Sequence, residues 1–222
     1  MAESRKEKWA RERNETLVRE RALWAEGLSL VAGVDEVGVG PLAGPLLAAA
    51  VILPADVAID GIRDSKKVSP KRREALFTEI CDEAISWSVG EVSAAEVDRL
   101  NPYQGALEAM RRAVTSLARP PHHVLVDART IPGIEPPQTA IVRGDASVYS
   151  IAAASIIAKV SRDRLMAGLD NQFPGYGFAR HAGYGTPEHF RALEALGPCP
   201  AHRRSFAPVR ERLVDAAGAK TR

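Results

Sequence analysis

Three short apolar segments of the sequence end on carboxylates, and these side chains have the clearest chemical potential in the chain. Asp35 and Glu36 follow one segment, Asp127 closes a second and Asp145 ends a third. In an α/β sheet, strand ends are where rigidly held side chains meet ligands. Carboxylates that converged there would repel one another unless cations lay between them, and all-oxygen ligands favour Mg²⁺ or Mn²⁺. Each acid alone could instead cap a helix or close a turn, but three such sites together favour a metal centre.

A glycine-rich loop, GVGPLAG at 38–44, directly follows the first carboxylate pair. It lacks the GxxxxGK[ST] pattern of a phosphate-binding P-loop and the spacing of a dinucleotide fingerprint. The loop is therefore either a structural turn or a place where a ligand approaches the main chain closely. Its position after Asp35 and Glu36 favours the second interpretation. The chain has no HExxH motif, and its histidines lack zinc-site spacing.

Basic side chains concentrate between residues 61 and 73, where GIRDSKKVSPKRR precedes and begins a predicted helix. Ser65, Lys66 and Lys67 lie just before that helix, a favourable place for phosphate oxygens. A solvated basic face is the alternative. In the tail, Tyr184 lies between glycines and could either stack on a base or sugar or pack into a small core. An aromatic content of 5% disfavours a stacking platform for single strands, so a duplex held by its backbone fits better.

The elements that must position these residues follow from periodicity and capping. Four short apolar runs and one mixed run predict strands over 28–36, 45–54, 86–92, 122–128 and 138–145. Helices are predicted over 1–27, 70–85, 102–118, 146–169 and 187–197, and the tail has one clear helix, with Thr186 as its N-cap and Gly197 as its stop. Strands that are first adjacent and then alternate with helices predict an α/β fold with a mixed sheet and helices on both sides.

Bulk properties restrict the function classes. The chain has 222 residues, 45% hydrophobic content and a formal net charge of only +2, so composition alone does not indicate a nucleic-acid-binding protein. Two distant cysteines give no disulfide framework. The charged N-terminus is no secretory signal, and no apolar run reaches the length of a membrane span. These features predict a soluble cytoplasmic protein.

Several long motifs resemble one family, ribonuclease HII, the type 2 RNase H enzymes. The segments are GVDEVGVGPLAGPLLAAAVILP, DSKK, VLVDA, GDASVYSIAAASIIAKVSRDRLM and FPGYGFARHAGYGTPEHFRALEALGPCPAHRRSF, in order from about residue 28 to 207. The resemblance implies an RNase H-like fold with a helical C-terminal appendage. We expect an N-terminal helix over 1–27, a catalytic core over 28–170 and a substrate-binding appendage over 171–222.

The resemblance also implies an activity, namely cleavage of RNA in RNA/DNA hybrids and on the 5′ side of single ribonucleotides in duplex DNA. The products would carry a 3′-hydroxyl and a 5′-phosphate, and the role would be ribonucleotide removal in DNA repair and removal of RNA primers. The family's metal-binding acids correspond to Asp35, Glu36, Asp127 and Asp145, with Mn²⁺ or Mg²⁺ as cofactor. We expect two metal ions to activate a water and stabilise the leaving 3′-oxygen.

Substrate contacts carry over by the same resemblance. The loop that reads the ribose 2′-hydroxyl matches Gly38, Val39 and Gly40, and the tyrosine at the adjacent sugar matches Tyr184. Ser65, Lys66 and Lys67 match the phosphate-contacting loop, and Asn101 a further backbone contact. The family usually has Gly-Arg-Gly where this chain has Gly38-Val39-Gly40. Valine can preserve a main-chain recognition geometry, but it removes a cation with five hydrogen-bond donors.

Two other functions compete with this one. A binding protein that grips hybrid duplex with weakened or altered cleavage would explain Val39, although it would not need a cluster of repelling carboxylates. A metal-dependent DNA nuclease or resolvase is the second, and the matches at the glycine loop and Tyr184 speak against it. No sliding-clamp peptide is recognisable, so no protein partner is inferred, and we expect a monomer that binds nucleic acid and no membrane.

Overall fold

A mixed five-stranded sheet forms the centre of the protein, whose computed structural model describes residues 3–218. The strands are β1 (Val31–Val37), β2 (Leu46–Ile52), β3 (Ser86–Val92), β4 (His123–Asp127) and β5 (Gln138–Ile141). Their order is β3-β2-β1-β4-β5, with β1 antiparallel to β2 and parallel to β4. The five predicted strands and the mixed sheet are therefore confirmed, with β3 at the predicted bounds, but the strand predicted over 138–145 ends at Ile141.

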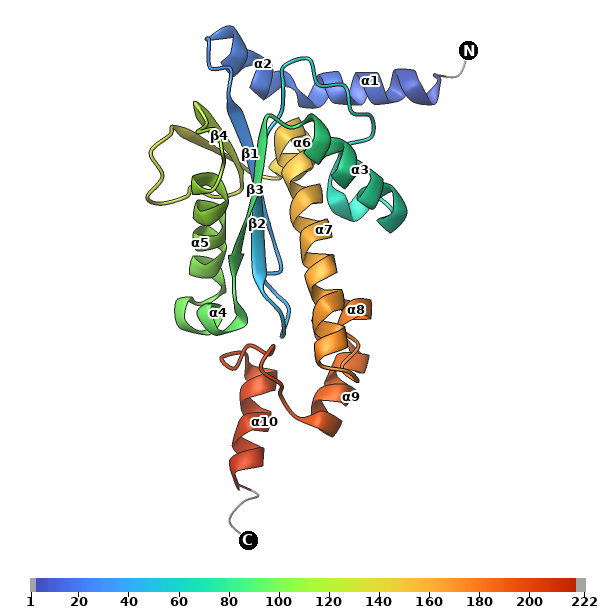
Figure 1. Cartoon of the computed structure of the whole chain (residues 1–222), viewed down its shortest axis with the longest axis vertical. Helices are drawn as coiled ribbons and strands as arrows, with labels where there is room; N and C mark the ends of the chain where they lie inside the picture. The colour runs from blue at the N-terminus through green and yellow to red at the C-terminus, as the bar shows by residue number, and fades with distance from the viewer. Residues whose placement is uncertain (1–2, 219–222) are drawn as a thin grey trace.

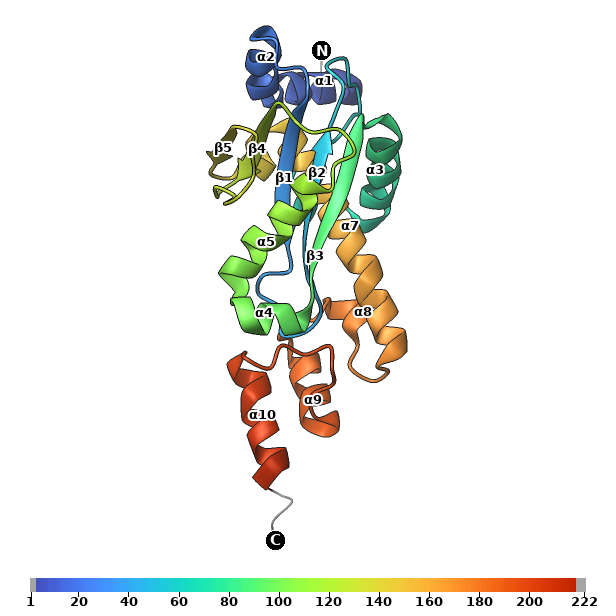
Figure 2. The same cartoon turned by 60° about the vertical axis from the view of Figure 1, so that its left-hand side comes forward.

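Helices cover both faces of this sheet (Figures 1 and 2). They are α1 (Arg5–Thr16), α2 (Val18–Ala25), α3 (Pro70–Glu83), α4 (Ala94–Leu100), α5 (Pro102–Thr115), α6 (Gly144–Ser147), α7 (Tyr149–Gln172), α8 (Phe178–His181), α9 (Pro187–Leu196) and α10 (Ala207–Gly218), with a 3₁₀ turn, η1, at Ser65–Lys67. In Figure 1, α7 and α3 lie on one side of the sheet and α5 on the other. Among the described residues, no helix has the length and apolar character needed to cross a membrane.

The central strands are buried on both faces, which explains their composition. Every residue of β2, LLAAAVI, is buried, as expected for a strand between two helical layers. The two faces carry separate apolar clusters, one beneath α7 and α3 and the other beneath α5. At Gly33 in β1, a Cβ would overlap the main chain of Ser150 in α7. This glycine lets the long helix lie directly on the strand that carries Asp35 and Glu36.

The N-terminal segment is not the single helix that charge periodicity predicts. It breaks at Leu17, which ends α1 and begins α2 and is buried in the core. The break lets Leu17 leave the solvated helix surface. It also directs the carboxylate of Glu20 to the start of α7, where it accepts a hydrogen bond from the Ser150 N–H at 2.8 Å. The N-terminal segment is therefore packed on the core through Leu17 and Glu20.

The tail beyond residue 172 holds more helix than the single one predicted. The helix at 187–196 is confirmed, with Thr186 accepting from the His189 N–H and Gly197 as C-cap. The short α8 and the C-terminal α10 were not predicted, and neither was α4, which precedes α5. In Figure 1, α9 and α10 lie at the end of the molecule opposite α1 and α2.

Candidate active site

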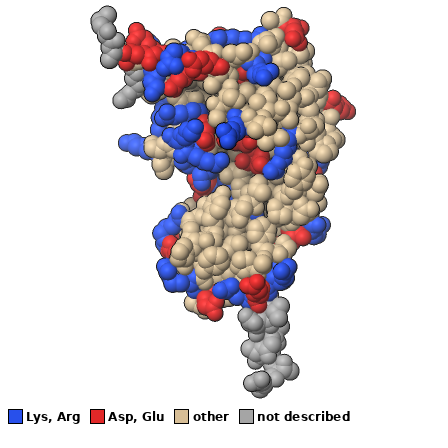
Figure 3. Space-filling view, turned by 180° about the vertical axis from the view of Figure 1, so that it is seen from behind, with Lys and Arg blue, Asp and Glu red and all other residues tan. Residues whose placement is uncertain are grey.

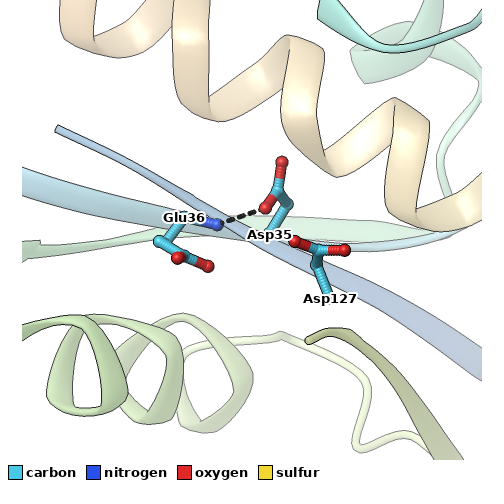
Figure 4. A group of neighbouring side chains, drawn as sticks. All are labelled: Asp35, Glu36 and Asp127. Carbon is cyan, nitrogen blue, oxygen red and sulfur yellow. Dashed lines mark hydrogen bonds between the residues drawn. The ribbon is translucent and has the colours of Figure 1, made fainter. Parts of the chain in front are cut away.

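Three of the predicted carboxylates converge at the centre of the sheet. One oxygen each from Asp35, Glu36 and Asp127 can be chosen so that all lie within 4.8 Å of one another. Asp35 and Glu36 are consecutive on β1 and leave the strand on opposite sides, while Asp127 comes from the end of the parallel neighbour β4 (Figure 4). The Asp35 carboxylate accepts a hydrogen bond from the Glu36 N–H at 2.8 Å, which fixes its orientation.

This group is electrostatically strained in the absence of a cation. Burial raises the pKa of Asp35 well above its ordinary value, and the charges of Glu36 and Asp127 raise it further. Burial also raises the pKa of Glu36, although Arg129, at 3.4 Å, opposes the effect. Glu36 Oε2 is buried and has no hydrogen-bond partner among the described residues. Clustered, partly unsatisfied carboxylate oxygens of this kind fit a hard divalent cation.

Asp145 is not placed as predicted. The run that contains it does not continue as a strand: β5 ends at Ile141, and Asp145 lies in the short helix α6. Arg143, with φ 57°, turns the chain out of the strand direction, and the Gly144 N–H donates to Asp127 Oδ1 at 2.7 Å. Asp145 is outside the group of three, yet its pKa is raised by burial and by the charge of Asp127. It is therefore an electrostatic neighbour of that group.

A cavity of about 250 Å³ joins two of these carboxylates to candidate substrate contacts. Its lining includes Asp35, Glu36, Lys66, Lys159 and Tyr184. Lys159, on α7, was not predicted as a site residue. Its ammonium group forms an ion pair with Asp163, one turn further along the same helix. No sequence signal singled it out: its place in the lining beside Ser155, four residues earlier on the same face of α7, is known only from the fold. On the face shown in Figure 3, Lys and Arg gather beside acidic side chains above a hollow.

The remaining predicted substrate contacts differ in how exposed their side chains are and in the hydrogen bonds they already make. Ser65 is buried, and its hydroxyl accepts a hydrogen bond from Ser155 at 2.8 Å. Both serines line the cavity that holds Asp35 and Glu36, and the contact of Ser65 with substrate stays a prediction. Lys66 and Lys67 are exposed, and Lys67 lines an adjacent cavity with Asp145. Asn101 Oδ1 accepts from the N–H groups of the first turn of α5, both at 3.0 Å. The structure gives Asn101 a capping role, and its contact with substrate stays a prediction.

Two buried arginines shape the glycine-rich loop, and neither was predicted to do so. Arg203 donates to the carbonyl oxygens of Gly38 at 2.6 Å and Val39 at 2.8 Å. Arg162, on α7, donates to the carbonyl oxygen of Pro45 at 2.9 Å, and a Cβ on Gly38 would overlap its guanidinium. Both side chains are fully buried, and burial lowers the pKa of Arg203 to about 10. Their charge is satisfied by main-chain oxygens rather than by a carboxylate.

The loop and the tyrosine are neighbours in space. The ring of Tyr184, which is 46% exposed, lies where a Cβ on Gly40 would be 3.9 Å from it. The Leu42 N–H donates to the Gly183 carbonyl at 2.8 Å, so a main-chain hydrogen bond joins the two segments. The Val39 side chain is half-buried against the apolar cluster beneath α5.

Comparison with known proteins gives this arrangement a family. A family model described as ribonuclease HII matches residues 32–209. The chain belongs to the ribonuclease HII family. A ribonuclease HII from Geobacillus thermodenitrificans is 56% identical over 209 residues, covering 94% of this chain and 80% of the relative. Membership makes the protein a divalent-metal-dependent endoribonuclease of the ribonuclease H type, active on RNA/DNA hybrids.

Solved structures agree with this membership. The ribonuclease H2 of Pyrococcus horikoshii matches with a TM-score of 0.71 and 29% identity, covering 83% of this chain and 97% of that one. A ribonuclease HIII, Bst-RNase HIII, was solved in complex with Mn²⁺; it matches with a TM-score of 0.60 and 21% identity over 88% of this chain and 73% of its own, which supports the fold alone. The RNase H-like architecture predicted from the motifs is thereby confirmed.

Proposed function

We propose that this ribonuclease HII cuts duplex DNA on the 5′ side of a single embedded ribonucleotide, as well as the RNA strand of hybrids. It would leave a 3′-hydroxyl and a 5′-phosphate and serve ribonucleotide removal in DNA repair and removal of RNA primers. The observation that supports this most strongly is that one cavity holds Asp35, Glu36 and Tyr184, with Gly40 beside the tyrosine ring. Groups suited to metal chemistry and to sugar recognition therefore share one space.

Asp35, Glu36 and Asp127 would hold divalent ions, Mn²⁺ or Mg²⁺, with Asp145 as a fourth ligand on the neighbouring helix. Bound there, two such ions supply the Lewis acidity that activates water and stabilises the leaving 3′-oxygen. The chain's own contribution is positioning. The bond from Gly144 to Asp127 ties the start of α6, and so Asp145, to the end of β4.

Substrate recognition would divide between charge and main chain. Lys66 and Lys159 would offer ammonium groups to the substrate phosphates, since both line the cavity that holds Asp35 and Glu36. The segment from Gly38 to Gly40 would read the 2′-hydroxyl, which is the group that distinguishes ribose from deoxyribose. Tyr184 would contact the adjacent sugar. Because Arg203 fixes this segment through its carbonyl oxygens, Val39 leaves the main-chain geometry in place.

The test is a comparison of three duplexes: DNA with one ribonucleotide, all-DNA, and uniform hybrid, each with Mg²⁺, Mn²⁺ or EDTA. We expect the first and third to be cut with metal, and products of the first to end in a 3′-hydroxyl. Cleavage of the all-DNA duplex, or no cleavage of any duplex with Mn²⁺, contradicts the proposal. An Asp35→Asn variant should bind without cutting, while Asp56→Asn, which changes an exposed acid outside the cavity, should retain activity.

A further inference from the structure

Three histidines are packed together inside the C-terminal part of the chain, and the proposed function does not use them. His189 and His202 are 0% and 2% exposed. The rings of His181 and His189 stack at 4.6 Å, and Phe178 packs edge-on against His189. Burying imidazoles in an aromatic environment is unfavourable unless their nitrogens are hydrogen-bonded, so the destination of each nitrogen matters.

The nitrogens of two rings form an unbroken chain of hydrogen bonds that ends on Tyr184. The Cys199 N–H donates to His202 Nδ1 at 3.0 Å, and the Cys199 sulfur is 3.1 Å from the same nitrogen. His202 Nε2 and His189 Nε2 lie 3.1 Å apart. His189 Nδ1 is 2.9 Å from the Tyr184 carbonyl oxygen.

The groups at the two ends of this hydrogen-bond chain determine which of the four ring nitrogens carry a proton. A carbonyl oxygen can only accept, so His189 Nδ1 must carry a proton and donate it to Tyr184. A main-chain N–H can only donate, so His202 Nδ1 must be bare and Nε2 must carry that ring's proton. His202 then donates to His189 Nε2. This relay of hydrogen bonds, from Cys199 through His202 and His189 to Tyr184, requires both rings to be neutral and each in a single tautomer. A second proton on either ring would point at another N–H group instead of an acceptor.

The hydrogen bond from His189 adds to two others on the Tyr184 main chain: its N–H donates to the His181 carbonyl at 2.9 Å, and its carbonyl also accepts from the Thr186 N–H at 2.8 Å. Tyr184 lies between Gly183, which has φ 78°, and Gly185, so the main chain on both sides of it has more conformational freedom than residues with side chains would allow. A Cβ on Gly183 would overlap the carbonyl of Ala43, which shows how closely this segment approaches the glycine-rich loop. The residue after His202 is Arg203, which donates hydrogen bonds to the carbonyl oxygens of Gly38 and Val39 in the same loop.

We propose that His189 and His202 are positioning residues for Tyr184, fixing its main chain so that its ring stays beside Gly40 in the substrate cavity. This rests on the proposed function, in which Tyr184 contacts the sugar. The residues 199–203 then set both recognition elements: Arg203 holds the glycine-rich loop, and His202, through His189, holds the tyrosine.

Two substitutions of His189 separate its two nitrogens. His189→Asn places an amide near Nδ1 and keeps a donor for the Tyr184 carbonyl, whereas His189→Gln places its amide near Nε2 and loses that donor. With DNA containing one ribonucleotide as substrate, we expect His189→Gln to raise KM about tenfold, the worth of one buried hydrogen bond, with kcat little changed. His189→Asn should stay near wild-type KM. Thermal unfolding of both variants identifies any loss of folded protein, which would lower kcat instead.

A double-variant cycle tests whether the effect passes through the tyrosine. In a Tyr184→Ala background, His189→Gln should raise KM no further. An added tenfold rise there, equal KM values for the Asn and Gln variants, or a fall in kcat alone would each overturn the proposal.

A spectroscopic measurement keeps this test separate from the activity. Long-range ¹H–¹⁵N correlation spectra of ¹⁵N-histidine-labelled protein at pH 7.5 report which ring nitrogens carry protons. We expect the Nδ1–H tautomer at His189 and the Nε2–H tautomer at His202. Any other protonation state overturns the relay even if the enzyme is active. If the spectra agree but no ribonucleotide-containing duplex is cut, it is the proposed function that fails.

Discussion

Replacing Asp35 by asparagine should stabilise the metal-free protein, although it should abolish cleavage. Asp35 is 7% exposed, and its carboxylate has oxygens of Glu36 and Asp127 within 4.8 Å. At that separation, two unit charges repel by between about 1 kcal/mol in bulk water and about 3.5 kcal/mol at an effective dielectric of about 20. Asparagine removes both repulsions and keeps an oxygen that can accept the Glu36 N–H.

The net gain will be smaller than the summed repulsions, because Asp35 can escape part of them by taking up a proton, as its raised pKa indicates. We expect about 2 kcal/mol at pH 8 in EDTA, which for a chain of this size raises the unfolding midpoint by about 4–8 °C. Saturating Mn²⁺ should reverse the order. A ligand at about 100 times its Kd stabilises the folded protein by about 2.7 kcal/mol, and the variant would lose most of that.

Differential scanning calorimetry of wild type, Asp35→Asn and the control Asp56→Asn, each in EDTA and in Mn²⁺, measures this crossing. A variant that is less stable than wild type in EDTA would show that the carboxylates do not strain one another. Equal stabilisation of wild type and variant by Mn²⁺ would show that Asp35 is not a ligand. Either result contradicts the metal-site argument without reference to catalysis.

Three further outcomes are expected. Glu20→Ala should lower the free energy of unfolding by about 1–3 kcal/mol, because it leaves the buried Ser150 N–H unpaired; Glu20→Gln keeps an acceptor and should lose less in urea unfolding. Burial and the neighbouring His189 lower the pKa of His202 to about 4 in the folded protein, whereas its ordinary value, near 6.5, applies in the unfolded chain. Between these two pH values the unfolded chain binds more protons, so the free energy of unfolding should decrease as the pH drops below about 6.5. At pH 5 the loss relative to a His202→Gln variant should be about 2 kcal/mol. Val39→Arg should tighten binding and increase cutting at a single ribonucleotide, with a steeper salt dependence of Kd; unchanged or weaker binding would show that the loop needs no arginine here.

Local signals predicted most of the fold, and the failures have two causes. The strand at 86–92 was placed correctly as a short run suited to a strand, although most of its buried residues are small or polar and Trp87 is exposed. Helix α9 was placed correctly because Thr186 and Gly197 mark its ends. Helix α4 carries a capping box, with Ser93 and Glu96 satisfying each other's main chain, so a signal for it was present. The break at Leu17 and the turn before Asp145 depend on packing against distant residues, which periodicity does not encode.

The site was predictable where its chemistry is local and unpredictable where it is tertiary. Consecutive carboxylates at the end of an apolar run indicate a ligand site from the sequence alone, and three of the predicted acids do meet. Arginine normally indicates a solvated surface, yet Arg162 is buried by a bond to Pro45, 117 positions away in the chain. The carbonyl oxygens that compensate for burying this guanidinium come together only in the folded chain.

That burial bears directly on the unusual residue of the glycine-rich loop. An arginine at position 39 would add a cation beside the substrate, but the shape of the loop is already imposed by Arg203 through the oxygens of Gly38 and Val39. The side chain at position 39 and the main chain at position 39 therefore have separable roles. If recognition of the ribose depends on the main chain, then Arg203→Lys, which loses the forked donor geometry, should reduce discrimination between ribonucleotide-containing and all-DNA duplexes. Val39→Arg should alter affinity for both kinds of duplex and leave that ratio nearly unchanged, and a shift of the ratio by Val39→Arg alone would refute the separation.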